Sequence, residues 1–182
     1  MPKSVLISVL ILMVFINKLS AQTTKKLDVG DHFPTIEGEL LSSKKISLPE
    51  HCKGKISLLI VAFKRGTQAQ IDTWTKAILQ EFGMQEEFRF IEIPMISNFY
   101  SWISNYIDNG MRKGIVQSMH QNVMTYYGPL DDYYKYFGVD DKKQCYVFLL
   151  DRKGKIRFID KGEAESHKLV LLINEVKKLL QQ

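Results

Sequence analysis

The pattern of hydrophobic and polar positions along the chain predicts strands that alternate with helices. Residues 36–41 and 45–48 alternate between apolar and polar types, which is typical of a short hairpin. Residues 56–63 then form a nearly continuous run of apolar and β-branched types. Because a strand that is covered on both faces shows no polar side, we expect this run to be a central parallel strand.

The next two segments extend this strand into a βαβ unit. Between residues 67 and 82 the apolar side chains recur at steps of three and four, which places them on one helical face. These side chains are Ile71, Trp74, Ile78 and Phe82. Residues 88–93 are again mainly apolar, and we expect Pro94 to end this second strand.

Residues 97–138 have a mixed pattern that predicts a long helical crossover rather than a second domain. We expect three helical pieces, which are separated by the turn-forming pairs Asn109-Gly110 and Gly128-Pro129. The pieces are residues 99–107, 111–126 and 130–137.

The remaining residues predict a closing hairpin and a terminal helix. The runs at residues 146–150 and 155–159 flank a turn at Asp151-Arg152-Lys153-Gly154, so we expect two antiparallel strands that complete the sheet. The last segment carries one apolar stripe, with lysines near its end where they complement the helix dipole. The stripe consists of Leu169, Leu172, Ile173, Val176 and Leu179. The whole pattern predicts an α/β protein with a central mixed sheet flanked by helices.

The first 22 residues have the pattern of a secretory signal peptide. Lys3 precedes an apolar run at residues 5–16, and residues 19–22 follow as a cleavage region. The run is shorter than the roughly 20 residues that a membrane-spanning helix needs. We therefore expect cleavage after Ala21 or Gln22, export to the periplasm or out of the cell, and one domain at residues 23–182.

Composition and charge exclude several classes of partner. The formal net charge is +5, and basic residues are interspersed with acidic ones, without an arginine-rich block that would follow a nucleic-acid backbone. The four histidines lack the short spacings of metal ligands. We expect no nucleic-acid partner, no metal and no cofactor. Cys52 and Cys145 permit one disulfide in an oxidising compartment, but the sequence leaves their pairing open.

Two local stretches resemble the redoxin branch of the thioredoxin-like proteins. The entry Val29-Gly30-Asp31-His32-Phe33-Pro34 and the closing hairpin at residues 148–156 are similar to those of periplasmic thiol-disulfide proteins and peroxiredoxins. The resemblance implies a thioredoxin-like fold, in which the reactive cysteine begins the helix after the first core strand. Here that segment, residues 64–71, contains no cysteine. Cys145 replaces the usual cis proline of thioredoxins, so we expect a trans peptide there.

A narrower resemblance, over most of residues 56–180, is to the mitochondrial ATP synthase assembly factors of the Atp-ten family, which lack the catalytic cysteines. Residues 146–151 carry it most strongly. The chain departs from the family at Cys145, at Phe158 and in its signal peptide. The resemblance implies an assembly factor or chaperone, and the identity of the client does not carry over. Similar residues are Trp74, Trp102, Ile103, Arg112, Gly154, Ile156, Arg157, Gly162 and Ala164.

These patterns leave two hypotheses for the function. The first is a noncatalytic protein that binds a protein or peptide client. The sequence leaves open whether this partner lies near a membrane. The second is a thiol oxidoreductase or peroxidase that uses Cys145, with Cys52 as its resolving partner, because Lys142 and Lys143 would favour a thiolate. The plainer interpretation of Cys145 is a small apolar residue that starts a buried strand.

The binding hypothesis has its own candidate residues. Arg65, Gln68 and Gln70 stand where redoxins carry the active-site turn, and their side chains suit hydrogen bonds to an extended peptide or to solvent. The aromatic residues within 99–102 and 126–137 suit either a protein surface or packing onto the sheet. The full candidate set is Arg65, Gln68, Gln70, Trp74, Trp102, Arg112, Tyr146 and Arg157. The sequence does not indicate an oligomeric state.

Overall fold

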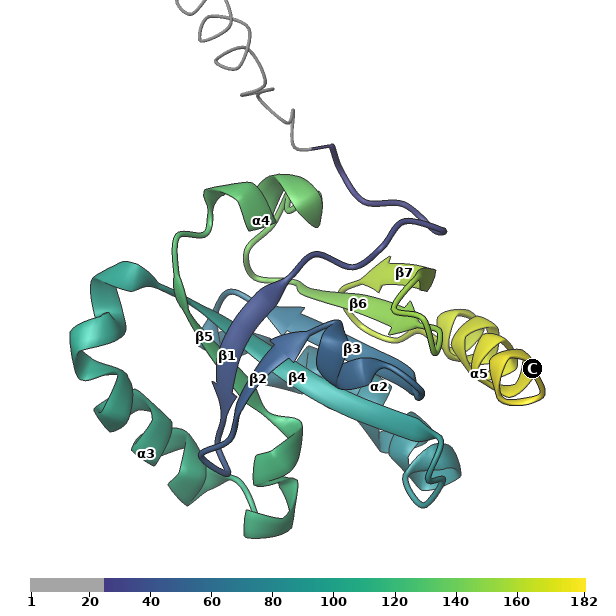
Figure 1. The fold of residues 1–182 in the computed structure, drawn as a ribbon, viewed down its shortest axis with the longest axis horizontal. Helices are drawn as coiled ribbons and strands as arrows, with labels where there is room; N and C mark the ends of the chain where they lie inside the picture. Colours follow the sequence, from purple (N-terminus) through teal and green to yellow (C-terminus); the bar gives the residue numbers. More distant parts are fainter. Residues whose placement is uncertain (1–24) are drawn as a thin grey trace, which may run out of the picture.

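In a computed structural model, which describes residues 25–182, the strands form one mixed seven-stranded sheet (Figure 1). The predicted signal peptide, residues 1–22, lies outside the described residues. The strands, in sheet order, are β2 (Lys45–Leu48), β1 (Ile36–Leu40), β5 (Met124–Gly128), β4 (Phe88–Ser97), β3 (Ile56–Ala62), β6 (Cys145–Leu150) and β7 (Ile156–Lys161). The helices are α2 (Gln68–Phe82), α3 (Ser104–Gly114), α4 (Asp131–Tyr136) and α5 (Ser166–Leu180), with 3₁₀ segments η1 (Glu50–Cys52), η2 (Arg65–Thr67), η3 (Asn98–Ile103) and η4 (Gln117–Asn122).

The predicted central strand is confirmed. Strand β3 lies between β4, with which it runs parallel, and β6, with which it runs antiparallel. Each of its residues is buried, as expected for a strand with helices or loops over both faces. Helix α2 follows it and buries the predicted stripe, Ile71, Trp74, Ile78 and Phe82. The βαβ unit is therefore present.

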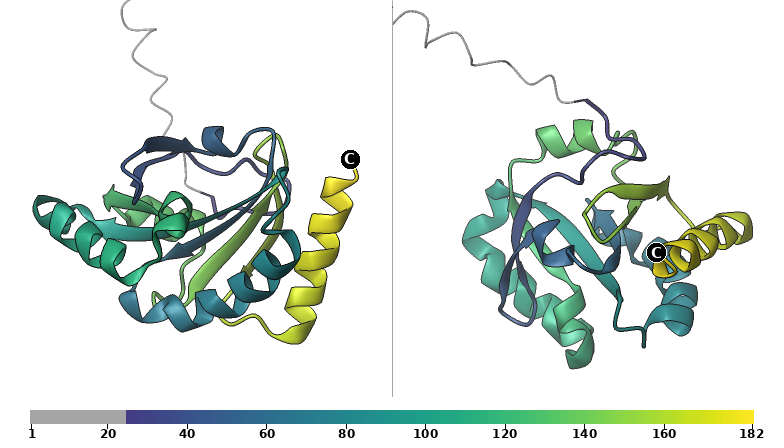
Figure 2. Two further views of the ribbon diagram at one scale, coloured as in Figure 1. Left: turned by 90° about the horizontal axis from the view of Figure 1, so that it is seen from below. Right: turned by 45° about the vertical axis from the view of Figure 1, so that its right-hand side comes forward.

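Each face of the sheet packs against different elements (Figure 2). Helices α2 and α5 cover one face. The hairpin β1–β2, the chain that precedes it and helix α4 cover the other. Alternate residues of β3 therefore enter two separate cores: Leu58 and Ile60 face α2, and Leu59 and Val61 face α4.

Strand β4 does not end at Pro94 as predicted, because it continues to Ser97. Its pairing with β3 ends where Ala62 lies opposite Pro94, and its continuous pairing with β5 begins at Met95. The strand thus changes partners at the residue that lacks an N–H group, so the proline removes little from the ladder.

The crossover contains a strand that the sequence pattern did not predict. The expected helix at residues 111–126 is wrong in its second half, because residues 124–128 form β5, parallel to β4 and antiparallel to β1. The expected break at Asn109-Gly110 is also wrong, because α3 runs through it. Gly110 lies inside this helix, where a side chain would meet open space. The third predicted piece is confirmed as α4.

The closing elements are as predicted. Strands β6 and β7 form an antiparallel hairpin, and α5 buries Leu172, Val176 and Leu179 of its apolar stripe. None of the helices within residues 25–182 has the length and apolar character that a bilayer-spanning helix requires.

Candidate functional site

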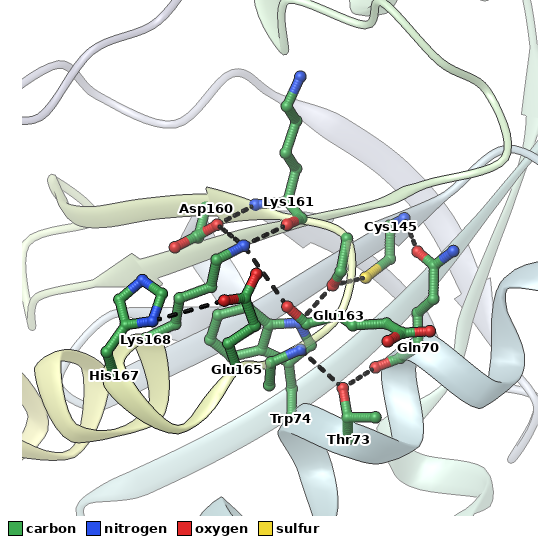
Figure 3. Close-up of polar contacts among 12 residues, drawn as sticks. Gln70, Thr73, Trp74, Cys145, Asp160, Lys161, Glu163, Glu165, His167 and Lys168 are labelled. Atoms are coloured by element: carbon green, nitrogen blue, oxygen red, sulfur yellow. Dashed lines mark hydrogen bonds and ion pairs between the residues drawn. The ribbon is translucent and has the colours of Figure 1, made fainter.

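The amino end of helix α2 carries amide side chains where redoxins carry thiols. Strand β3 ends at Ala62, and η2 leads directly into the helix. Figure 3 shows Gln70 reaching from α2 to the chain that enters β6. Gln70 Nε2 donates to the carbonyl of Lys143 at 3.1 Å, and Gln70 Oε1 accepts from the backbone N–H of Cys145 at 3.1 Å. One carboxamide thus bridges two alternate residues, as a residue of an added parallel strand would.

This bridge corrects the role predicted for Gln70. Both halves of its carboxamide are bonded within the molecule, so they are not free to bind an extended peptide. The backbone that a client strand would pair with is occupied by the same contacts. We therefore assign Gln70 to the structure of this end of the sheet.

The Cys145 thiol is buried. Its side chain has no exposed surface, and Sγ donates to the carbonyl of Gly162 at 3.2 Å. Burial raises the pKa of Cys145 to about 11, which leaves the thiol protonated at neutral pH. The peptide bond before Cys145 is trans, as predicted. Among the described residues, the cis peptide bond is the one between Leu48 and Pro49.

Cys52 lies too far from Cys145 to serve as its resolving partner. Cys52 is also fully buried, but it belongs to the core that contains α4, whereas Cys145 belongs to the core that contains α2. Cys52 accepts a hydrogen bond from Lys55 next to the start of β3, and Cys145 pairs with Ala62 at the other end. That strand spans about 20 Å, and a disulfide requires Cα atoms within about 7 Å. Both cysteines are free.

Two predicted binding residues belong to the core instead. Trp74 has no exposed surface, and its Nε1 donates to the carbonyl of Gly162 at 2.7 Å (Figure 3). Tyr146 is also buried, and its hydroxyl lies 3.1 Å from a carboxylate oxygen of Asp140. Side chains with almost no exposed surface cannot bind a partner, so we assign both residues to the stability of the fold.

Arg65 and Gln68 remain exposed at the start of α2. Gln68 Nε2 donates to Asp72 Oδ1 at 3.0 Å, one helical turn further on. Arg65 makes no ion pair with the described residues. These two are the predicted residues of the former active-site turn that a partner can reach.

A buried carboxyl group near this end was not among the predicted site residues. Glu92, on β4, is 9% exposed. Burial raises the pKa of Glu92 to about 7; Gln68 opposes this increase, and the nearby carboxylate of Asp72 adds to it. The only signal in the sequence is a glutamate within the mainly apolar strand segment at residues 88–97.

The inserted segment η3–α3 presents aromatic side chains to solvent. Trp102 is 80% exposed, Tyr106 is 81% exposed and Phe99 is 72% exposed. We call this surface, which also includes Tyr100, the η3–α3 surface. Trp102 lies in η3 and Tyr106 in the first turn of α3. Of these residues, only Trp102 is in the predicted set.

The two remaining predicted residues serve other elements. Arg112 Nε donates to the carbonyl of Leu41 at 2.7 Å, which attaches α3 to the β1–β2 turn. Arg157 pairs with Asp151 at 2.7 Å and braces the β6–β7 hairpin. The structure therefore does not bring the eight predicted residues together into one site. Residues 25–182 contain no group of three or more histidine, cysteine or carboxylate side chains placed to hold a metal ion.

Similarity to solved structures supports the thioredoxin-like fold. BsSco, a member of the Sco family of cytochrome c oxidase assembly proteins, is 17% identical with a TM-score of 0.60, over 85% of this chain and 96% of that chain. The thioredoxin domain of a thiol-disulfide oxidoreductase from Bacteroides vulgatus is 17% identical with a TM-score of 0.55, over 82% and 98%. A peroxiredoxin-like protein from Aquifex aeolicus is 18% identical with a TM-score of 0.53, over 85% and 88%. At these identities the likeness concerns the fold alone.

Sequence comparison identifies the family. No curated protein matches the chain in sequence. The model of the family described as ATP10 protein matches residues 19–179, which is nearly the whole chain and includes every element of the sheet. The chain therefore belongs to the ATP10 protein family and has a thioredoxin-like fold.

Proposed function

We propose that this protein is an exported, noncatalytic thioredoxin-like assembly factor that binds a polypeptide client through the η3–α3 surface and the exposed start of α2. The observation that carries the proposal is the contrast between sequestered thiols and exposed aromatic rings. The protein keeps the fold of thiol enzymes, yet its two thiols are buried in separate cores.

The state of the thiols supports the noncatalytic part. A redoxin thiol must be exposed and ionised to attack a substrate. Cys145 has neither property, and no cysteine stands at the start of α2. We therefore do not retain the oxidoreductase hypothesis.

The η3–α3 surface supports the binding part. Exposed Trp and Tyr are the residue types enriched at the centres of protein interfaces, where they supply large contact areas. In the sequence, serine and asparagine residues alternate with Phe99, Trp102 and Tyr106, and they bring hydrogen-bonding groups to the same segment. From Asn98 to Val123 the single acidic residue is Asp108, which is buried and accepts from the Tyr127 hydroxyl at 2.7 Å. The surface itself is therefore uncharged or basic.

The test is site-specific photo-crosslinking in the source cells. A photoreactive phenylalanine analogue at position 102 should crosslink a defined client, whereas the same analogue at Met84, which is 97% exposed, should not. Combining the crosslinker with Tyr106→Ala should reduce the yield of the same product. Equal products from positions 102 and 84 would indicate nonspecific contact and would refute the proposed surface.

Export is tested separately by N-terminal sequencing of the mature protein. We expect it to begin at Gln22 or Thr23, because the small residues Ser20 and Ala21 follow the apolar run. A mature protein that retains residues 1–22 in the cytoplasm would overturn this part and leave the binding proposal untouched.

A further inference from the structure

A groove lined by tyrosines lies between helix α4 and the chain that leads into β1. Its volume is about 960 Å³, and its apolar wall consists mainly of Tyr126, Tyr133, Tyr136, Pro34 and Pro129. We call it the tyrosine groove.

The tyrosine groove is separate from the η3–α3 surface. Tyr126 and Tyr127 are neighbours on β5 and point to opposite sides of the strand. Tyr126 lines the groove, while the Tyr127 hydroxyl donates to Asp108 of α3 at 2.7 Å. The groove has no role in the function proposed above.

The wall of the groove is anchored to the core. The Tyr133 hydroxyl donates to the carbonyl of Thr35 at 3.1 Å, and its ring meets that of Tyr126 edge-on, with centroids 5.1 Å apart. The other side of the Tyr133 ring stacks on Phe137 at 5.9 Å, and Phe137 stacks on buried Phe33 at 5.6 Å. A ligand would therefore meet rings that are already in place and would not have to order them.

The rim of the groove has an unneutralised acidic group. Asp131 and Asp132 both line it and are exposed. Lys135 pairs with Asp132 at 3.5 Å, whereas Asp131 has no ion pair within the described residues. His32 is the other titratable group of the lining besides the tyrosines. Asp131 thus favours a ligand that carries a positive charge.

Tilted aromatic rings next to prolines, with a carboxylate at the rim, match the chemistry that recognises polyproline II segments. Such segments present flat proline rings at a rise of about 3.1 Å per residue and lose little conformational entropy when they bind. We propose that the tyrosine groove binds a proline-rich segment of a partner polypeptide, with a lysine or arginine of that segment beside Asp131.

The experiment is a binding screen with the full chain and an array of fluorescently labelled peptides. The array holds ten-residue sequences with two prolines at varied spacing and one Arg or Lys at either end. Each has a partner in which alanine replaces proline and another in which glutamate replaces the basic residue. We expect saturable binding of a subset that requires both proline and the basic residue.

Matched variants assign the binding to the groove. Asp131→Lys should weaken the best peptide about fivefold, because it reverses the charge at an exposed position. Tyr136→Ala should weaken it about tenfold through loss of ring contact. Glu86→Lys, another exposed acid, and Tyr106→Ala, on the η3–α3 surface, should leave the affinity unchanged.

Three results would overturn the proposal: no saturable binding anywhere in the array, equal binding of the proline-free peptides, or equal weakening by Tyr106→Ala. Circular dichroism confirms that each variant is folded before its affinity is compared. Because crosslinking from position 102 does not involve the groove, client capture can succeed or fail independently of this result.

Discussion

Burial determines the chemistry of Cys145. Its thiol lies in an apolar core beneath α2 and donates to Gly162, and burial raises its pKa to about 11. The lysines at 142 and 143, which the sequence places nearby, are exposed and do not offset the loss of water around the sulfur. Proximity in sequence was therefore a poor guide to the state of this group.

We predict that a thiol-specific alkylating reagent modifies Cys145 in the folded protein far more slowly than an exposed cysteine between pH 6 and 9. A cysteine introduced by Met84→Cys serves as the exposed control, because position 84 is 97% exposed. Peptide mass spectrometry after timed labelling distinguishes the sites. Rapid labelling of Cys145 below pH 7 would reveal a thiolate and restore the redox hypothesis.

Glu92 gives the protein a pH-dependent stability. Its pKa is raised from an ordinary value of 4.5 to about 7, so the folded state binds the proton more tightly than the unfolded state. Glu92 therefore contributes most to the stability of the folded protein below pH 4.5, and this contribution is lost as the pH rises through about 7. At 1.36 kcal/mol per pKa unit, the loss is about 3 kcal/mol.

We predict that Glu92→Gln makes the protein more stable at pH 8.5 by about 2 to 3 kcal/mol and has little effect at pH 5, because glutamine carries no charge to bury. Urea unfolding at both pH values measures the difference. Glu86→Gln, at an exposed position, is the control and should change stability by less than about 0.5 kcal/mol. Parallel stability curves for Glu92→Gln and the parent would contradict this role.

Among the elements, α3 depends on a few polar attachments rather than on a broad apolar face. Its single buried residue is Asp108, which accepts from Tyr127, and Arg112 holds its last turn to Leu41. A helix held in this way should open locally more easily than α2, which buries four large apolar side chains.

We predict that Arg112→Ala speeds amide hydrogen exchange in residues 104–114 by about fivefold, since a part-buried hydrogen bond contributes about 1 kcal/mol. Exchange in β3 should not change. Lys113→Ala removes a neighbouring charge but leaves the hydrogen bond from Arg112 to Leu41 in place, so it should leave α3 protected. Equal acceleration by both substitutions would mean that helix charge, not the contact to Leu41, is responsible.

The arrangement of the whole molecule keeps its two thiols apart. Cys52 and Cys145 lie on opposite faces and near opposite ends of β3. We predict that a mild oxidant forms no Cys52–Cys145 disulfide in the folded protein, and that a reductant does not change its thermal midpoint. Non-reducing electrophoresis of native and urea-unfolded samples provides the measurement, and a disulfide formed by the native sample would show that the sheet opens widely.

The η3–α3 surface should contribute to client binding and little to the stability of the whole molecule. We predict that replacing Phe99, Trp102 and Tyr106 together by serine changes the free energy of unfolding by less than about 1 kcal/mol, because these rings are already in water. The same protein should fail to capture its client. Val170→Ser with Leu171→Ser, at exposed positions on α5, provides an apolar control that should retain capture.

Local pattern determined most elements of this protein. The stripe of α2, the continuous run of β3 and the β6–β7 hairpin were predicted because each has a periodicity that its own residues display. The absence of a cysteine at the start of α2 is likewise evident from the sequence alone, because the fold does not dictate which residue stands there. The resemblance of residues 146–151 to one family also agrees with the family match.

Tertiary structure alone decided the rest. Strand β5 forms because β4 and β1 leave a place between them, and residues 124–128 had no alternation strong enough to reveal it. Trp74 and Trp102 are the same residue type, yet one is fully buried and the other 80% exposed, because α2 packs its apolar face into the core whereas η3 buries none of its residues. Exposure, pairing of distant groups and pKa depend on what the fold brings near each residue, and no local pattern contains that information.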